Sequence, residues 1–160
     1  MSGKIGLQVD LISAGCVHLI LSDYSLLCCL MPSLYIIYRE GTEEYVWDNY
    51  EESVPMSTYL VAFVVSKFAN EVSPQTDNNV MFRIWARKDA LDQVAYAKDV
   101  GPRMLEYFED FFNVSYPLPK QDMIAIPDFS AGAMENWGLI TYRETALLFK
   151  PGVSALGMYV

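Results

Sequence analysis

The stretch with the clearest chemical potential runs from Gly132 to Asn136 and reads Gly-Ala-Met-Glu-Asn. Glu135 could hold a cationic group such as an ammonium, because a carboxylate forms strong charge-assisted hydrogen bonds. Gly132 and Ala133 have little or no side chain, so another backbone could approach them closely. Met134 would shape an apolar wall, and Asn136 would anchor the turn. Taken alone, these five residues are more typical of a glycine-containing connection between strands with a solvated Glu135.

The sequence around this stretch favours the chemical interpretation. The string from Ile126 to Glu144 resembles the exopeptidase signature of the aminopeptidase N family of zinc metallopeptidases. The flanks at 116–122 and 145–149 resemble the same family, as does the upstream segment Val54–Tyr59. The resemblance covers roughly residues 45–150, and the residues in this range are most similar to those of the insect members.

The resemblance implies roles for individual residues. Glu135 is expected to hold the amine of a peptide, while the stretch around it pairs with the peptide like an added strand. Trp137, Tyr142 and Arg143 are expected to pack and orient the strand, and the role of Glu144 stays open. The predicted substrate-binding residues are Gly132, Ala133, Met134, Glu135 and Asn136.

Histidine content limits what the chain can do with metal. The sequence contains one histidine, His18, whereas a protein zinc site takes three or four ligands. In the family, a His-Glu-x-x-His helix and a further Glu bind zinc, and the Glu within the motif acts as general base. No such motif occurs up to Val160. We therefore expect no catalytic residue, no metal-binding residue and no zinc on this chain, although zinc is the cofactor of the parent family.

Composition narrows the class of protein. Hydrophobic residues make up 52% and charged residues 19% of the chain, which excludes an extended disordered chain. The formal net charge of −9 repels phosphate backbones, so nucleic acid is not an expected partner. The family resemblance, rather than composition, implies peptide N-termini as partners, with possible membrane association. All three cysteines (Cys16, Cys28 and Cys29) lie near the start, without zinc-ribbon spacing.

The N-terminal segment is the part that the family resemblance leaves unexplained. Residues 5–38 are largely apolar, but the longest uncharged run, Tyr24–Tyr38, has 15 residues and contains Pro32. A membrane-spanning helix needs about 20 apolar residues. We rank a buried or poorly folded segment first and a degenerate membrane or secretion signal second. The family resemblance implies a plasma-membrane or extracellular location.

Hydrophobic patterns predict the elements around the motif. The run Tyr59–Val65 predicts a strand buried on both faces. Alternation in Val80–Arg87 predicts a strand with one buried side, formed by Val80, Phe82, Ile84 and Ala86. Short apolar runs at Met123–Ile126 and Leu139–Tyr142 predict two further strands on either side of the motif.

A helix is predicted over residues 90–112. Apolar side chains recur there at spacings of three and four, as in an amphipathic helix. Gly101 and Pro102 either kink this helix or begin a second one, and Pro117 and Pro119 are expected to end it. The recurring apolar residues are Met104, Leu105, Phe108, Phe111 and Phe112.

The resemblance, rather than these patterns, predicts the overall fold class. It is α+β, with C-terminal strands of an antiparallel β-sandwich-like domain followed by the start of a thermolysin-like catalytic domain. The expected divisions are an unmatched apolar segment at 1–38, the end of the N-terminal β domain at 39–88, and a peptidase domain at 89–160 that is truncated before the zinc helix.

The predicted function follows from the motif and from the missing zinc ligands. The chain is interpreted as a fragment of a zinc metalloaminopeptidase, a hydrolase that removes N-terminal residues from peptides, and it is expected to be inactive alone. Two alternatives stay open: a noncatalytic peptide- or partner-binding module, and an unstable truncated product. Cutting both domains is expected to expose apolar strand edges and lower solubility.

Overall fold

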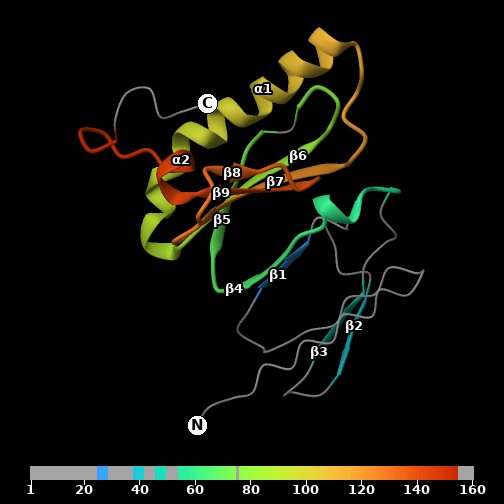
Figure 1. Cartoon of the computed structure of the whole chain (residues 1–160), viewed down its shortest axis with the longest axis horizontal. Coiled ribbons are helices and arrows are strands. Elements are labelled where there is room, and N and C mark those ends of the chain that lie inside the picture. Colours follow the sequence, from blue (N-terminus) through green and yellow to red (C-terminus); the bar gives the residue numbers. More distant parts are fainter. Residues whose placement is uncertain (1–24, 29–37, 42–45, 50–53, 75, 155–160) are drawn as a thin grey trace.

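The computed structural model describes residues 25–28, 38–41, 46–49, 54–74 and 76–154 (Figure 1). Strands dominate, and one long helix interrupts them. The elements in chain order are β1 (Ser25–Cys28), β2 (Tyr38–Gly41), β3 (Val46–Asn49), the 3-10 helix η1 (Thr58–Leu60), β4 (Phe63–Ser66), β5 (Ala69–Val72), β6 (Met81–Ala86), the 3-10 helix η2 (Lys88–Gln93), α1 (Ala95–Phe112), β7 (Lys120–Ile126), β8 (Ala133–Met134), β9 (Leu139–Arg143) and α2 (Glu144–Leu147).

Five of these strands form one mixed sheet in the order β5-β6-β7-β9-β8. The central pairs β6–β7 and β7–β9 are parallel, whereas β5 and β8 run antiparallel to their neighbours at the two edges. Helix α1 joins β6 to β7, as a parallel pair requires a long crossover. The predicted combination of helix and strands is therefore confirmed, but the antiparallel sandwich-like part of the prediction is not confirmed by the described strands.

The same sheet contains strands from both sides of the domain boundary expected at residues 88 and 89. Strands β5 and β6 precede that point, and β7, β8 and β9 follow it. Strand β4 pairs instead with β1 in a separate two-stranded sheet, and β2 pairs with β3 in another. The division at 88/89 stays a prediction, and one hydrogen-bonded sheet runs across it.

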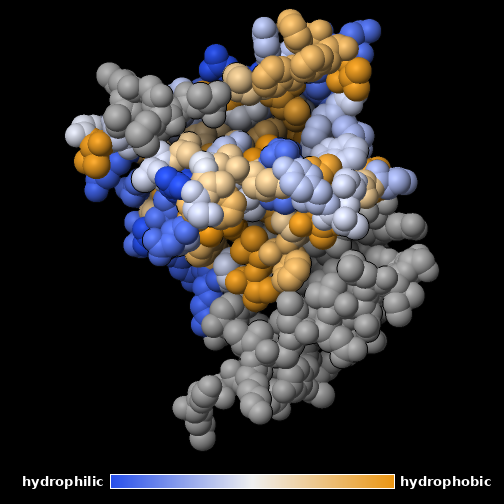
Figure 2. All heavy atoms as spheres, in the orientation of Figure 1, coloured by the Kyte–Doolittle hydropathy of each residue, from blue (hydrophilic) through white to orange (hydrophobic). Residues whose placement is uncertain are grey.

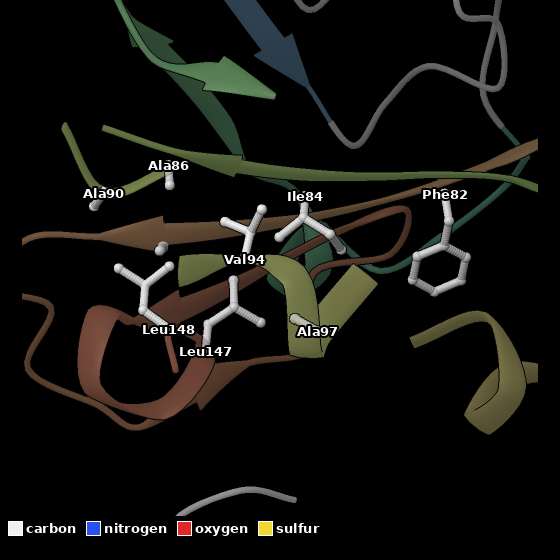
Figure 3. Packing of buried hydrophobic residues seen from close by; sticks show 9 residues of the cluster. Phe82, Ile84, Ala86, Ala90, Val94, Ala97, Leu147 and Leu148 are labelled. Atoms are coloured by element: carbon white, nitrogen blue, oxygen red, sulfur yellow. The ribbon is translucent and has the colours of Figure 1, made fainter. Parts of the chain in front are cut away.

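Strand β6 confirms the predicted strand, but the prediction of a single buried side is wrong, because Trp85 on the opposite face is buried as well. The side chains of Phe82, Ile84 and Ala86 are each 3% exposed or less and belong to one core cluster. Figure 3 shows Ile84 pointing toward Val94 and Ala97. On the opposite face Trp85 is buried with Ile124 and Leu139, beneath partly buried apolar residues of the segment 61–68. Both faces of the central sheet are thus covered, one by α1 and α2 and the other by the chain that includes β4.

Helix α1 continues through Pro102 as a single helix, which decides between the two sequence alternatives. The glycine before this proline lets the helix lie close to the sheet. A Cβ atom at Gly101 would come within 2.9 Å of Cε1 of Phe82 and 3.3 Å of Sδ of Met123. The helix ends at Asn113, which adopts a left-handed backbone with φ 52°. The end therefore precedes both prolines that the sequence suggested as helix breakers.

The recurring apolar residues of α1 do not all face the sheet. Leu105 packs against the core cluster, but Met104, Phe108, Phe111 and Phe112 are 40–66% exposed. Figure 2 shows apolar atoms gathered along this helix. We call Tyr107, Phe108, Phe111 and Phe112 the aromatic ridge, because their rings contact one another at centroid distances of 5.0–6.0 Å.

The predicted doubly buried strand at Tyr59–Val65 is wrong in part. Its first residues form η1, where the Ser57 hydroxyl accepts a hydrogen bond from the backbone N–H of Tyr59 at 3.4 Å. Only Phe63–Ser66 form a strand, and Phe63 is 39% exposed. Local capping by Ser57 therefore prevails over strand propensity at the start of this run.

The core cluster predicts a large loss on truncation of Ile84. Ile84→Ala should lower the free energy of unfolding by about 2–5 kcal/mol, because the removed atoms leave a cavity in a packed interior. Val153→Ala, at a side chain that is 74% exposed, is the control and should leave stability almost unchanged. Urea unfolding followed by circular dichroism would check this, and equal midpoints for the two variants would contradict the assigned core.

Candidate functional site

Strand β8 is a short strand at one edge of the five-stranded sheet. Ala133 lies opposite Tyr142 of β9, and Met134 lies opposite Thr141. One residue earlier, the backbone N–H of Arg143 donates to the carbonyl oxygen of Gly132 at 2.9 Å. No other described strand pairs with β8 on its outer side.

The five residues singled out from the sequence differ in exposure. Gly132, Ala133 and Glu135 are exposed, Met134 is half-buried and Asn136 is buried. A Cβ atom placed on Gly132 would meet no atom within 4 Å. The structure therefore presents open space at the glycine and a carboxylate beyond the strand, while the last residue of the stretch points into the protein.

Asn136 anchors the turn that joins β8 to β9. Its side-chain oxygen accepts a hydrogen bond from the Thr141 hydroxyl at 3.0 Å, and its amide nitrogen donates to the carbonyl oxygen of Leu60 at 3.3 Å. Its backbone oxygen accepts from the N–H of Leu139 at 3.1 Å. Gly138 completes the turn with φ 83°, a conformation that favours glycine.

Glu135 has a partner that sequence reasoning missed. The hydroxyl of Tyr59 donates to Oε1 of Glu135 at 3.0 Å, across 76 positions of sequence. This hydrogen bond and the nearby negative charge of Glu135 raise the pKa of Tyr59. The segment Val54–Tyr59 carried part of the family resemblance, but no pattern in the sequence joined its last residue to Glu135.

Arg143 holds the loop that leads into β8. Its Nε donates to the carbonyl oxygen of Phe129 at 2.8 Å, and its Nη2 donates to the carbonyl oxygen of Ser130. Glu144, whose role was open, accepts from Nε of Arg87 at 2.7 Å. These contacts connect the C-terminal end of β9 and the start of α2 to the loop before β8 and to the residue that follows β6.

A buried carboxylate lies next to the site, at the centre of the sheet. The Asp122 side chain is 1% exposed and accepts from Nε and Nη2 of Arg83 at 2.5 and 2.6 Å. Nζ of Lys120 donates to it at 2.8 Å, and Nε1 of Trp85 donates at 3.1 Å. Burial alone would raise the pKa of Asp122. The charges of Lys120 and Arg83 lower this pKa by more than burial raises it, so the pKa lies below its ordinary value.

This buried cluster is tied directly to the turn after β8. Both Nζ of Lys120 and the backbone N–H of Asp122 donate to the carbonyl oxygen of Gly138, at 2.8 and 3.0 Å. The charged residues Lys120 and Asp122, directly before an apolar run, were the sequence signal that could have indicated this buried cluster. The sequence analysis took only Met123–Ile126 as the strand, so both charged residues fell outside it.

Comparison with known proteins shows a similarity that includes this edge of the sheet. Residues 96–159 match the Peptidase family M1 domain. The chain is 51% identical over 107 residues, or 67% of its length, to endoplasmic reticulum aminopeptidase 1 of Mus musculus. It is 51% identical over 120 residues, or 72% of its length, to aminopeptidase N of Canis lupus familiaris. Residues 96–159 are therefore similar to part of an M1 peptidase domain.

The M1 relatives are much longer than this chain. The chain spans 11% of the mouse protein, 12% of the dog protein and 14% of aminopeptidase N from Oryctolagus cuniculus, to which it is 45% identical over 136 residues. Another similar protein is aminopeptidase N of the species Haemonchus contortus, at 49% identity. These relatives support the M1 aminopeptidase assignment but do not confirm the resemblance to insect members in particular.

The zinc that the M1 resemblance implies has no site in the described part of the chain. Within residues 54–74 and 76–154 and the three short strands before them, no three His, Cys, Asp or Glu side chains lie together as metal ligands. His18 lies outside the described residues. The described residues do not offer a donor set that fits zinc.

None of the helices in the described part of the chain has the length and apolar character needed to cross a membrane. The predicted buried or signal-like segment within residues 5–38 lies mostly outside the described residues. The predicted membrane association and the plasma-membrane or extracellular location therefore stay predictions.

The buried cluster predicts strong destabilisation by Asp122→Asn. Lys120 is 2% exposed, and removing the carboxylate leaves its buried charge without that partner, at a cost of about 3–5 kcal/mol. Asp99→Asn is the control, because Asp99 forms an exposed salt bridge with Arg103, and it should change stability little. Urea unfolding at neutral pH measures both, and similar midpoints would contradict the role given to Asp122.

The same cluster predicts a pH dependence. The pKa of Asp122 is lowered in the folded chain, so its stabilising contribution is present above its unfolded value of about 3.9 and is lost as pH falls through the folded pKa. Unfolding midpoints measured from about pH 5 downward should therefore fall more steeply in the wild type than in Asp122→Asn. Parallel pH profiles for the two proteins would argue against the shift.

Proposed function

We propose that residues 132–136 form one wall of a site that binds the free N-terminus of a peptide, as part of a protein that removes N-terminal residues from peptides. The observation that carries this proposal is the exposed carboxylate of Glu135, which directly follows an edge strand with an open outer side. The names of the M1 relatives, which are aminopeptidases, support the same function.

The register of β8 supports strand addition by the peptide. In an antiparallel pair, alternate residues direct their backbone N–H and C=O groups to the partner. The carbonyl of Gly132 already accepts from Arg143 of β9, so the backbone groups of Ala133, the next residue, are directed to the outer side. An extended peptide could pair with Ala133, and the open space over Gly132 lets its backbone approach.

The position of Glu135 supports recognition of an amine. It lies two residues beyond Ala133 in the chain, so a peptide paired at Ala133 would bring its terminal residue near this carboxylate. An ammonium group donates up to three hydrogen bonds, and an ionised carboxylate is its strongest side-chain acceptor. The net charge of −9 also attracts cationic ligands over a longer range.

Binding and positioning are the steps that the described residues can perform. Asn136 fixes the turn through the Thr141 hydroxyl and the Leu60 carbonyl, and this holds Glu135 at the end of the edge strand. Hydrolysis by the 160 residues alone is not part of the proposal, because the sequence contains one histidine. The same geometry supports the alternative of a noncatalytic module that binds peptide N-termini.

The proposed amine site predicts that Glu135→Gln weakens amine binding. L-Leucinamide should bind the variant about ten-fold more weakly, since a charge-assisted hydrogen bond contributes about 1.5 kcal/mol or more and each 1.4 kcal/mol is a factor of ten. N-Acetyl-L-leucinamide, which lacks the charge, should not distinguish the two proteins. Calorimetric or NMR titration would provide the dissociation constants.

Glu106→Gln is the matched control for this measurement. Glu106 lies on α1 and accepts a hydrogen bond from the N–H of Asp77, an interaction that glutamine can keep. The Glu106→Gln variant should bind L-leucinamide with the same affinity as the wild type. If Glu135→Gln lowers the melting temperature but leaves the affinity unchanged, Glu135 has a structural role and the amine site is wrong.

The histidine count predicts that the purified 160-residue chain does not hydrolyse leucine p-nitroanilide, with or without added zinc. It also predicts no stoichiometric zinc after dialysis, because a zinc site takes three or four ligands and the chain has one histidine. Elemental analysis and an absorbance assay on the same preparation check both. Chelator-sensitive turnover by demonstrably pure protein would refute this prediction.

A further inference from the structure

The short helix η1 contacts the candidate site at two neighbouring points. The hydroxyl of Tyr59 donates to Oε1 of Glu135 at 3.0 Å, and the side-chain amide of Asn136 donates to the carbonyl of Leu60 at 3.3 Å. Consecutive residues of one segment thus bind consecutive residues of the other. The contact is not confined to the surface, because Asn136 is 5% exposed.

Two backbone hydrogen bonds define the conformation of η1. The N–H of Leu60 donates to the carbonyl of Ser57 at 3.0 Å, and the N–H of Val61 donates to the carbonyl of Thr58 at 3.2 Å. Downstream, Val61, Ala62 and Val64 pack against the cluster of Trp85, Ile124 and Leu139. Tyr59 is therefore presented by a segment that is anchored on both the core and the motif, although its own side chain is 62% exposed.

We propose that Tyr59 is a positioning residue of the amine site, which holds Oε1 of Glu135 and adds its phenolic oxygen as a second acceptor for a primary ammonium group. This inference rests on the proposed function. A carboxylate has about four lone-pair positions, so Oε1 can accept from Tyr59 while Oε2 accepts from a ligand. Fixing the carboxylate beforehand reduces the side-chain entropy that binding would otherwise cost.

The two acceptors define the class of ligand. A primary ammonium group can donate one N–H to Oε2 of Glu135 and another to the phenolic oxygen of Tyr59, because that oxygen donates its hydrogen to Oε1 and keeps its lone pairs. A trimethylated amine carries the same charge but has no N–H. The site should therefore select primary amines over quaternary ones, whereas a purely coulombic or cation–π site would accept both.

Titration of L-leucinamide into four proteins tests this inference: the wild type, Tyr59→Phe, Glu135→Gln and the control Tyr107→Phe. Tyr107 is 59% exposed and lies on α1, so the control removes a hydroxyl of similar exposure. Tyr59→Phe should weaken binding by about three- to ten-fold, the usual effect of one lost hydrogen bond. Tyr107→Phe should bind as the wild type does. In the wild type, N,N,N-trimethyl-L-leucinamide should bind more weakly than L-leucinamide.

A second readout follows the hydroxyl itself. The pKa of Tyr59 is raised by Glu135, so in Glu135→Gln it should fall toward its ordinary value of about 10. Selective labelling of tyrosine rings and NMR titration would measure this shift. Tyr107 is the internal reference, and its titration should not respond to the Glu135→Gln substitution.

The possible outcomes separate this inference from the proposed function. If Glu135→Gln weakens binding and Tyr59→Phe does not, the amine site stands and the role of Tyr59 is overturned. If L-leucinamide binds Glu135→Gln as tightly as the wild type, both are overturned. Weaker binding by Tyr59→Phe, with an unchanged control and poor binding of the trimethylated amine, supports the inference.

Discussion

The buried carboxylate of Asp122 is the constraint on which the site depends. An ionised group that is almost fully enclosed must have partners, because its desolvation costs several kcal/mol. Arg83 on the neighbouring strand and Lys120 on the same strand supply opposite charge, and Trp85 supplies an N–H. Strands β6 and β7 are therefore joined by side chains as well as by their backbone ladder.

A short series of hydrogen bonds connects this cluster to the motif residues. Lys120 and the backbone of Asp122 share the carbonyl of Gly138, and this fixes the turn before β9. Asn136 lies in that turn and binds both Thr141 and Leu60. The exposed Glu135 is thus adjacent to a residue that the interior holds in place, which is the arrangement a binding carboxylate needs.

Several strands could be predicted from sequence, because apolar residues recur along them at alternate positions or in short runs. The alternation of Phe82, Ile84 and Ala86 predicted β6, and the apolar runs beside the motif predicted β7 and β9. Three-dimensional contacts explain what stayed open. The sequence left two alternatives for Gly101 and Pro102, and no local pattern shows that Gly101 lies against Phe82 within a single helix.

The candidate site was predictable in part for the same reason. The five motif residues are contiguous, so their resemblance to a family was visible in one stretch of sequence. Tyr59 and Glu135 lie 76 positions apart, and a hydrogen bond between exposed polar residues leaves no periodic signal. Lys120 and Asp122 have residue types that are usually exposed, so only their place directly before the apolar run Met123–Ile126 could have indicated their burial.

Residue-specific mapping of a bound peptide tests the central claim, that the outer side of β8 and Glu135 receive a peptide N-terminus. ¹⁵N-labelled chain would be titrated with L-leucyl-glycyl-glycine and with its N-acetylated form. The account predicts that the amides of Ala133 and Glu135 shift and exchange more slowly with the free-amine peptide but not with the acetylated one. Equal shifts with both peptides, or shifts centred on the aromatic ridge of α1, would contradict it.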